Sequence, residues 1–379
     1  MKKTCIFIMR NPYIEKVPNV MYWIRYLAAH DYRTVILSSK DAMYPPAEFE
    51  SEQVCYETPA GCDGPSQRFV SLRLLARALS LARQVRPSFI VGIDALGNVV
   101  ASVVSRSAGV PHVAFILEYP SPRASRRSVR DRLEAVALRG GHLVVTHDKY
   151  HREFLVREVD LVEARIHLLP NGSGPRGYRT PGRYFVDVLG LAPDDKIILH
   201  SGGFGPWFCC HELAAAAAQW ERSRKLVFHT SHHVDTTPYA VEFRSRGLDK
   251  HAVLHSSPVP DSQLDELVGS ASIGLATYSL DLLGFRAEYL GLAAGKIGRY
   301  LKNGIPVIAT NVASIREYVD GYRCGLCVDR FDQLDNAIST ILADYGTYRA
   351  NAFRCYEELW DVEKPCAELT TCLESLKAV

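Results

Sequence analysis

Short apolar runs, many of them β-branched, alternate along this chain with longer stretches in which apolar residues recur every three or four positions. The short runs predict buried strands and the longer stretches predict amphipathic helices, an alternation typical of parallel sheets with crossover helices. The expected strands are 5–9, 34–37, 89–93, 112–116, 143–146, 196–200, 225–229, 252–255, 273–276 and 306–309. The expected helices are 17–29, 68–85, 97–108, 126–139, 212–221, 262–268, 292–302 and 313–319.

The alternation is interrupted once, at 169–177, where the sequence LPNGSGPRG contains only one apolar residue and many turn formers. We therefore expect a linker here between two domains, 1–177 and 178–355, followed by a helical tail at 356–379. The predicted fold class is α/β, with two Rossmann-like parallel-sheet domains facing across a cleft. In such sheets ligands bind at the carboxyl ends of the strands, so the residues that follow each strand are the candidates for chemistry.

Composition narrows the class of protein. Of the 379 residues, 47% are hydrophobic and 23% are charged, values typical of a globular protein and incompatible with a mostly disordered chain. No apolar run approaches the roughly 18 residues of a membrane span. The apolar stretch near the start ends at Arg10, which is short for a signal peptide, so we expect a first buried strand and a cytoplasmic location.

The net charge of +2 conceals an asymmetry between the two halves. Residues 1–177 contain 24 Lys and Arg against 17 Asp and Glu, whereas residues 178–379 contain 20 against 25. The basic half has few aromatic residues among its arginines, so we do not expect nucleic acid as a partner. Five arginines fall within 123–132, and we expect them to face anionic lipid or a phosphate-bearing acceptor, the alternative being a solvated helix.

Metal and redox chemistry receive little support. The pair Cys324 and Cys327 has C-x-x-C spacing, but no second pair or suitably spaced histidine completes a zinc site, so packed core thiols are favoured. His229, His232 and His233 have no carboxylate or cysteine at ligand spacing and are interpreted as loop histidines. The chain contains no D-x-D pair to hold a metal-bound nucleotide, and no metal is expected.

Two segments of the second half could hold an anion. After the strand 196–200 the sequence Ser-Gly-Gly-Phe-Gly runs into a helix, and such glycines let a ligand approach the backbone, although a simple turn is the alternative. It does not match the dinucleotide fingerprint G-x-G-x-x-G. Lys296 follows Gly295 in a first helical turn, where a cation opposes the helix dipole. A bound phosphate would offset that cost, whereas the alternative is a solvated lysine.

In the first half, Asp94 and Glu118 follow predicted strands and are candidates to position or deprotonate a hydroxyl group. A helix cap at Asp94 and a surface ion pair at Glu118 are the structural alternatives. His112 and His147 are weaker candidates, and His112 is expected to point away because it starts a strand.

These motifs together resemble GT-B glycosyltransferases of the family 4 type. The resemblance is carried by Leu-Pro-Asn-Gly at 169–172, Ser-Gly-Gly at 201–203, the block Gly-Lys-Ile-x-Arg-Tyr-Leu-x-x-Gly-Ile-Pro-Val-Ile-Ala at 295–309, and Glu-Tyr-Val at 317–319. The match is specific over 291–328, and the rest of the chain agrees in layout, including Asp94 and Glu118.

The resemblance implies a hexosyl-type glycosyltransferase that moves a sugar from a nucleotide-diphosphate sugar in the second domain to an acceptor hydroxyl in the first. It further implies retention at the anomeric carbon, no metal or other cofactor, and a final helix that crosses back onto the first domain. The acceptor is expected to be lipid-linked or phosphate-bearing, with peripheral contact at the inner membrane face. The donor-binding set that follows is Gly202, Gly203, Phe204, Gly295, Lys296, Arg299, Glu288 and Glu317.

The sequence departs from the family pattern at its paired glutamates, E-x7-E, which would fall on Gly291 and Arg299. Contacts to the donor ribose then have to come from elsewhere, and Glu288 is the candidate. Another departure is Arg-Asn-Pro at 10–12, where many relatives have glycines. Two alternatives therefore remain, a nucleotide-sugar epimerase or hydrolase on the same architecture and a non-catalytic partner subunit.

Overall fold

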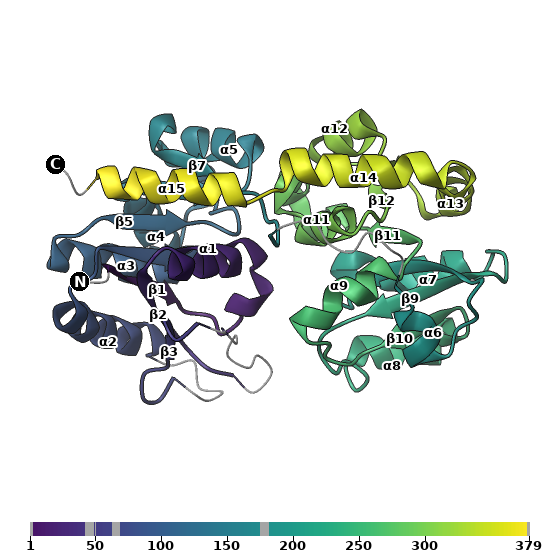
Figure 1. Ribbon diagram of the computed structural model, residues 1–379, viewed down its shortest axis with the longest axis horizontal. Helices are drawn as coiled ribbons and strands as arrows, with labels where there is room; N and C mark the ends of the chain where they lie inside the picture. Colours follow the sequence, from purple (N-terminus) through teal and green to yellow (C-terminus); the bar gives the residue numbers. More distant parts are fainter. Residues whose placement is uncertain (1–2, 42–48, 50, 63–68, 175–181, 377–379) are drawn as a thin grey trace. The chain divides into compact units, whose positions relative to one another are not determined.

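The computed structural model describes residues 3–41, 49, 51–62, 69–174 and 182–376. The chain forms two compact units, one made of residues 1–174 and 361–379 and the other of residues 175–360. Each unit is a wholly parallel sheet with helices on both faces (Figure 1), so the α/β class with two Rossmann-like sheets is confirmed. The expected boundary between 177 and 178 lies outside the described residues, and the expected cleft stays a prediction.

The first unit contains a seven-stranded sheet in the order β3-β2-β1-β4-β5-β6-β7. The strand order reverses direction between β1 and β4, whose carboxyl ends are in register at Met9 and Ile93, with Phe115 of β5 beside them. In chain order the strands are Lys3–Met9, Tyr32–Ser38, Val54–Glu57, Phe89–Ile93, His112–Phe115, Leu143–Thr146 and Ile166–Leu168.

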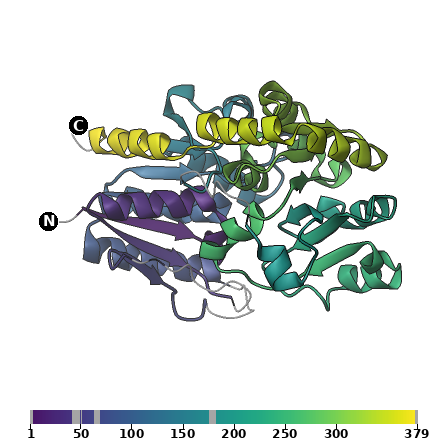
Figure 2. The same ribbon diagram turned by 45° about the vertical axis from the view of Figure 1, so that its right-hand side comes forward.

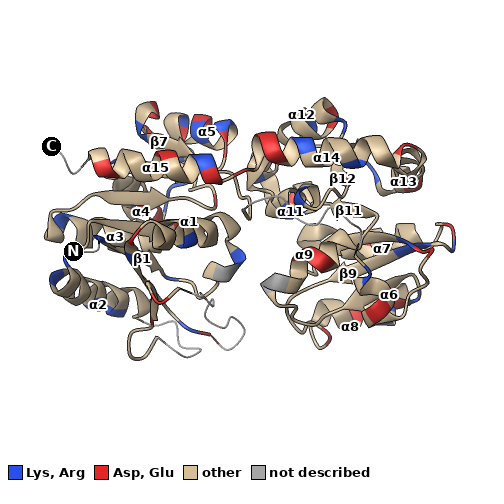
Figure 3. Ribbon diagram, viewed as in Figure 1, with Lys and Arg blue, Asp and Glu red and all other residues tan. Residues whose placement is uncertain are grey.

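Helices cover both faces of this first sheet. They are α1 (Pro18–Ala29), α2 (Val70–Val85), α3 (Asp94–Ala108), α4 (Val129–Arg139), α5 (Lys149–Val159) and α15 (Glu363–Ser375). On one face Trp23 of α1 packs within 6.3 Å of the rings of Phe7, Phe89 and Phe115. The opposite face is covered by α2 and α3, and α2 carries three arginines and no acidic residue (Figure 3).

Helix α15, the last of the chain, completes the core of the first unit. It runs alongside α1 (Figures 1 and 2) and buries Cys366, Leu369 and Leu373 in the same cluster as Trp23. The Trp23 indole N–H also donates to the Thr370 hydroxyl at 3.4 Å. Without these side chains, part of the apolar face of α1 would be exposed to water.

The second unit contains a six-stranded sheet in the order β10-β9-β8-β11-β12-β13, with its reversal between β8 and β11. The strands from β8 onward are Lys196–Ser201, Arg224–His229, Ala252–His255, Ile273–Ala276, Val307–Thr310 and Gly325–Val328. The helices are α6 (Tyr184–Leu189), α7 (Cys210–Ala217), α8 (Pro238–Ser245), α9 (Asp261–Gly269), α10 (Leu280–Leu283), α11 (Gly295–Lys302), α12 (Ala313–Tyr322), α13 (Leu334–Ala343) and α14 (Tyr345–Leu359).

The core of the second unit is built around α11. The ring of Tyr300 fills the space over Gly274 of β11, where a Cβ atom would lie only 2.4 Å from the ring. On the same helix, Gly298 makes room for Trp360, whose ring would lie 2.4 Å from a Cβ atom at that position. These two close approaches fix α11 between the sheet and the end of α14.

Among the described residues, no helix has both the length and the apolar content needed to cross a membrane.

Candidate functional site

Lys296 lies beside the glycine loop that follows β8. Its Nζ atom is 3.5 Å from Nε2 of His200 and lies 4.0 Å from the ring centroid of Phe208 and 5.3 Å from that of Tyr278. A Cβ atom on Gly202 would lie 3.5 Å from the same Nζ atom. The fold therefore brings together the first turn of α11 and the Ser-Gly-Gly loop, two segments that the sequence places far apart.

The ammonium group of Lys296 is in an unusual electrostatic position. Burial lowers its pKa to about 7, and the nearby thiols of Cys210 and Cys209 only partly oppose this effect. Within the part of the chain that the structure describes, no carboxylate forms an ion pair with it. Lys296 is half-buried, and because desolvating a charge without a counter-ion is costly, the site is suited to an anion.

His200 holds the glycine loop in place. Its Nε2 atom lies 3.0 Å from the carbonyl oxygen of Gly203, and since a carbonyl can only accept, Nε2 carries the hydrogen in the neutral ring. Burial, with the charge of Lys296, lowers the pKa of His200 well below its usual value, so the ring is neutral. The contact with Lys296 is then no hydrogen bond, which leaves the ammonium hydrogens available to a ligand.

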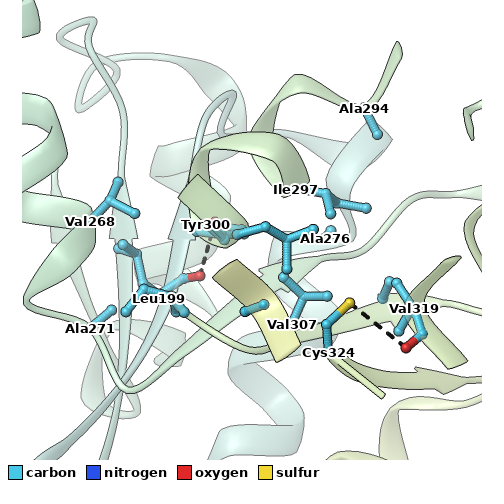
Figure 4. Packing of buried hydrophobic residues seen from close by; sticks show 14 of the residues in the cluster. Leu199, Val268, Ala271, Ala276, Ala294, Ile297, Tyr300, Val307, Val319 and Cys324 are labelled. Carbon is cyan, nitrogen blue, oxygen red and sulfur yellow. Dashed lines mark hydrogen bonds between the residues drawn. The ribbon is translucent and has the colours of Figure 1, made fainter. Parts of the chain in front are cut away.

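Tyr300 fixes the helix that carries Lys296 to the ends of two strands. Its hydroxyl accepts from the backbone N–H of Ser201 at 2.7 Å. The same hydroxyl can donate to the carbonyl oxygen of Leu199 at 3.0 Å (Figure 4) or to that of Leu275 at 3.3 Å. Tyr300 lies one helical turn after Lys296, so this single hydroxyl sets the position of the lysine relative to the glycine loop.

The other predicted donor residues are distributed differently. Gly203 lies in the loop, where a Cβ atom would be 2.5 Å from the ring of Phe208, and Gly295 begins α11. The ring of Phe204 packs against Phe228, Tyr239 and Phe243 with centroids 5.2–5.4 Å apart, so this side chain belongs to the core. Glu288, on the turn Gly284–Tyr289, and Glu317, on α12, are both exposed.

Arg299 is directed toward α9. Its Nη1 atom lies 3.8 Å from Oδ1 of Asp265, and the same carboxylate binds Nζ of Lys302 at 2.5 Å and the side-chain amide of Asn303 at 3.3 Å. The arginine that replaces the family's glutamate is therefore part of an ion-pair cluster that joins α11 to α9.

In the first unit, Asp94 follows β4 and begins α3 with a positive φ of 59°. Aspartate is among the few residues besides glycine that adopt this left-handed conformation readily, so the chain can turn directly from β4 into α3 at this position. Burial and the negative charge of Glu118 raise the pKa of Asp94 to about 7, although the backbone N–H of Leu117 donates to its carboxylate. The fold thus brings Asp94 and Glu118 together, and a carboxyl group with this pKa is suited to general-base catalysis.

Glu134 of α4 is a member of this cluster that the sequence analysis missed. It is buried, and burial together with the charge of Asp94 raises its pKa to about 7, while Arg130 opposes the shift. Glu134 occupies the inward face of α4 with Ala135 and Leu138. A carboxylate on an otherwise apolar helix face was the signal that could have identified it.

The two histidines considered as weaker candidate bases, His112 and His147, both have lowered pKa values, which makes them weaker bases than Asp94. His147 follows β6, with Nδ1 3.4 Å from the Asn19 amide and Nε2 3.3 Å from the carbonyl oxygen of Leu117. Burial, with the neighbouring His151, lowers the pKa of His147 to about 4, so it is a neutral support for the loop that leads to Glu118. His112 starts β5, at the amino ends of the strands and thus opposite to Asp94, and burial lowers its pKa to about 3.

No group of three or more His, Cys, Asp and Glu side chains that could hold a metal ion occurs among the described residues. Cys324 is buried with its Sγ atom 3.7 Å from the carbonyl oxygen of Val319, and Cys327 is partly buried.

Two protein-family models match this chain, one in each half. A family model described as a glycosyl transferase 4-like domain matches residues 18–172, and one described as the C-terminal domain of glucosyltransferase 3-like proteins matches residues 217–360. A search of curated protein sequences finds no significant match.

Solved structures share the whole fold at low sequence identity. Sucrose-phosphate synthase from Thermosynechococcus elongatus is 17% identical with a TM-score of 0.76, covering 99% of this chain and 99% of its own. HepE from Anabaena, solved with UDP and glucose, is 16% identical with a TM-score of 0.74, covering 98% of this chain and 100% of its own. WaaG, a glycosyltransferase of lipopolysaccharide biosynthesis, is 12% identical with a TM-score of 0.68, covering 98% and 99%. The two family models match different parts of the chain, and the solved structures share its whole fold. The chain therefore has the GT-B fold, and its residues 18–172 match a glycosyl transferase 4-like domain, as the sequence resemblance predicted.

Proposed function

We propose that this protein transfers a hexosyl group from a nucleotide-diphosphate sugar to an acceptor hydroxyl, without a metal ion and with retention at the anomeric carbon. The observation that carries the proposal is the half-buried Lys296, whose ammonium lies beside Gly202 with no carboxylate partner among the described residues. A diphosphate is the anion that a glycine loop, a helix N-terminus and a lysine are suited to bind together. The UDP and UDP-glucose complexes of HepE support a donor of this class.

Lys296 would act on the leaving group. As the glycosidic bond breaks, negative charge grows on the diphosphate, and a positioned cation stabilises it most where water is excluded. The incoming anion also raises the pKa of Lys296 from about 7, so the lysine is protonated in the donor complex. Tyr300 and His200 keep the loop and the helix in place, so little reorganisation is needed during the reaction.

Asp94 is proposed to position or deprotonate the acceptor hydroxyl, with Glu118 beside it. Its pKa near 7 allows a substantial carboxylate fraction at neutral pH together with sufficient basicity. The acceptor is proposed to be lipid-linked or phosphate-bearing. For the donor ribose we propose Glu288, since Arg299 at the family's glutamate position is bound to Asp265.

The proposal is tested by replacing Lys296. Lys296→Ala should weaken donor binding and lower kcat about 10²–10³-fold, in the range observed when other charge-stabilising groups are removed. Lys296→Arg should restore only part of the activity, because a planar guanidinium does not overlay a compact ammonium. Lys196→Ala, at an exposed position at the start of β8, is the matched control and should behave like the parent. If Lys296→Ala bound donor and turned over like the parent, the proposed diphosphate contact would be wrong.

Measuring donor consumption with and without an acceptor distinguishes a transferase from a hydrolase, an epimerase and a non-catalytic subunit. A transferase consumes the donor only when an acceptor is present, whereas a hydrolase or epimerase consumes it alone. A partner subunit without catalytic activity would leave the donor intact under both conditions.

A further inference from the structure

The outer face of α4 combines exposed apolar side chains in a single row. Val129, Leu133 and Val136 are 72%, 47% and 50% exposed, and their spacing of four and three residues places them on one side of the helix. The opposite side of α4 is buried, with Ala135 and Leu138 against the first unit. Single exposed aliphatic residues are common, but an aligned row on a surface helix indicates a contact with an apolar medium or partner.

Arginines surround this row, and the structure divides the five-arginine run into two groups. Arg123 pairs with Asp160, and Arg126 donates to the carbonyl oxygens of Ser121 and Glu158, so these two attach the preceding turn to the end of α5. The other three arginines, which are exposed, are Arg127, Arg130 and Arg132. In the part of the chain that the structure describes, neither Arg127 nor Arg132 forms an ion pair.

Few negative charges compensate these arginines. Asp131, in the capping box of α4, contributes one negative charge, and its side chain accepts from the backbone N–H of Ser128 and pairs with no arginine among the described residues. Glu134 points inward, and burial raises its pKa. The surface of α4 is therefore positive on both sides of an apolar row, which is the pattern of helices that lie in the interface of a membrane.

We propose that α4 and the turn before it form a docking surface for an anionic lipid bilayer. Val129, Leu133 and Val136 enter the boundary between headgroups and acyl chains, and Arg127, Arg130 and Arg132 contact lipid phosphates. A protein partner fits the surface less well, because the row has no aromatic residue of the kind that anchors protein interfaces.

The location of α4 suits a lipid-linked acceptor. This inference about the acceptor, unlike the docking surface itself, rests on the proposed function. Arg130 and Glu134 both act electrostatically on Asp94, so the docking helix adjoins the candidate base. A bilayer on α4 would place lipid headgroups near Asp94, where a lipid-linked hydroxyl could be reached.

Sedimentation with lipid vesicles tests the docking surface directly. The full-length protein should sediment with phosphatidylcholine vesicles that contain about one third phosphatidylglycerol, remain in solution with phosphatidylcholine alone, and be released by salt. Arg127→Ser with Arg132→Ser should weaken binding roughly 30-fold, and Leu133→Asp should also reduce it strongly. The matched control is Arg222→Ser with Lys250→Ser. It removes the same number of positive charges, two, from exposed positions of the second unit and should bind vesicles like the parent.

Thermal melting of each variant establishes that loss of binding is not loss of folding, since all four arginine and lysine positions and Leu133 are exposed. Binding by the arginine variant equal to that of the control, or no binding by the parent, would overturn the docking surface. Lys296→Ala provides the separation from the proposed function, because it should still bind vesicles even if it transfers no sugar.

Discussion

At the scale of single residues, the main feature is Lys296, which is only partly protonated near neutral pH in the free protein. Lys296 has a pKa of about 7 because its surroundings are poor at solvating the ammonium group, and a nearby anion would reverse that shift. Asp94 and Glu134 show the opposite behaviour, since burial raises the pKa of both to about 7. Because these three pKa values lie near 7, ligand affinity at Lys296 and the stability of the first unit should both change with pH near neutrality.

The lysine predicts proton uptake when a nucleoside diphosphate binds. At pH 8 the free protein holds Lys296 mostly neutral, whereas the bound diphosphate favours the ammonium, so binding of UDP should take up nearly one proton. At pH 6 the lysine is already protonated and the uptake should be small. Calorimetric titration in two buffers with different ionisation enthalpies measures this number. Lys296→Met should abolish the difference between pH 8 and pH 6, and its persistence in that variant would assign the proton to another group.

Glu134 predicts a pH-dependent loss of stability. Its folded pKa of about 7 lies above the unfolded value near 4.3, so the native state binds the extra proton between these values. The contribution of this group is fully present below about pH 4 and is lost as pH rises through about 7. Glu134→Gln should therefore raise the melting temperature at pH 8 more than at pH 5. Equal effects at the two pH values would show that the carboxyl group is not in a desolvated position.

At the scale of elements, α11 joins the candidate donor site to the core of the second unit. Its Lys296 end meets the glycine loop, Tyr300 ties it to β8 and β11, and Gly298 packs on Trp360. Ligand affinity and local stability should thus depend on the same helix.

Tyr300→Phe separates these effects by removing one oxygen atom. The backbone N–H of Ser201 loses its acceptor, so we expect a cost of about 1–3 kcal/mol in the free energy of unfolding and weaker donor binding. Denaturant unfolding and a donor titration measure the two effects. The control is Tyr322→Phe, because the Tyr322 hydroxyl meets Glu358 at an exposed position. If Tyr300→Phe were as stable as this control, the hydroxyl would not hold the loop.

The elements also show what sequence could predict. Long apolar periods and buried runs identified the central strands, because hydrophobic pattern alone determines them. Strands β3, β7 and β13 are absent from the expected strands, since all three are short and lie at sheet edges. Helix α3 begins at Asp94 instead of 97 because an aspartate can adopt the left-handed turn. Lys296 was identifiable from its misfit with the helix dipole. The roles of His200, Tyr300 and Glu134 depend on which segments the fold places together, and no local pattern contains that information.

At the scale of the whole molecule, the first unit is discontinuous in sequence. Residues 361–379 belong to it, although residues 175–360 form the second unit between them. Removing 361–379 should expose the apolar side chains of α1 around Trp23 and destabilise the first unit more than the second. Hydrogen exchange measured at increasing temperature would show how much stability each unit loses. Protection of β1 and β4 that is unchanged in the truncated protein would contradict this expectation.

The position of α15 also affects the order in which the protein is made. The ribosome synthesises residues 1–174 first but supplies the helix that covers Trp23 only after residues 175–360 have emerged. At the usual 5–20 residues per second, this delay is roughly 10–40 s. During that interval the first unit carries an uncovered apolar face, which is the kind of surface that chaperones bind. The second unit is contiguous in sequence and can fold without waiting for α15.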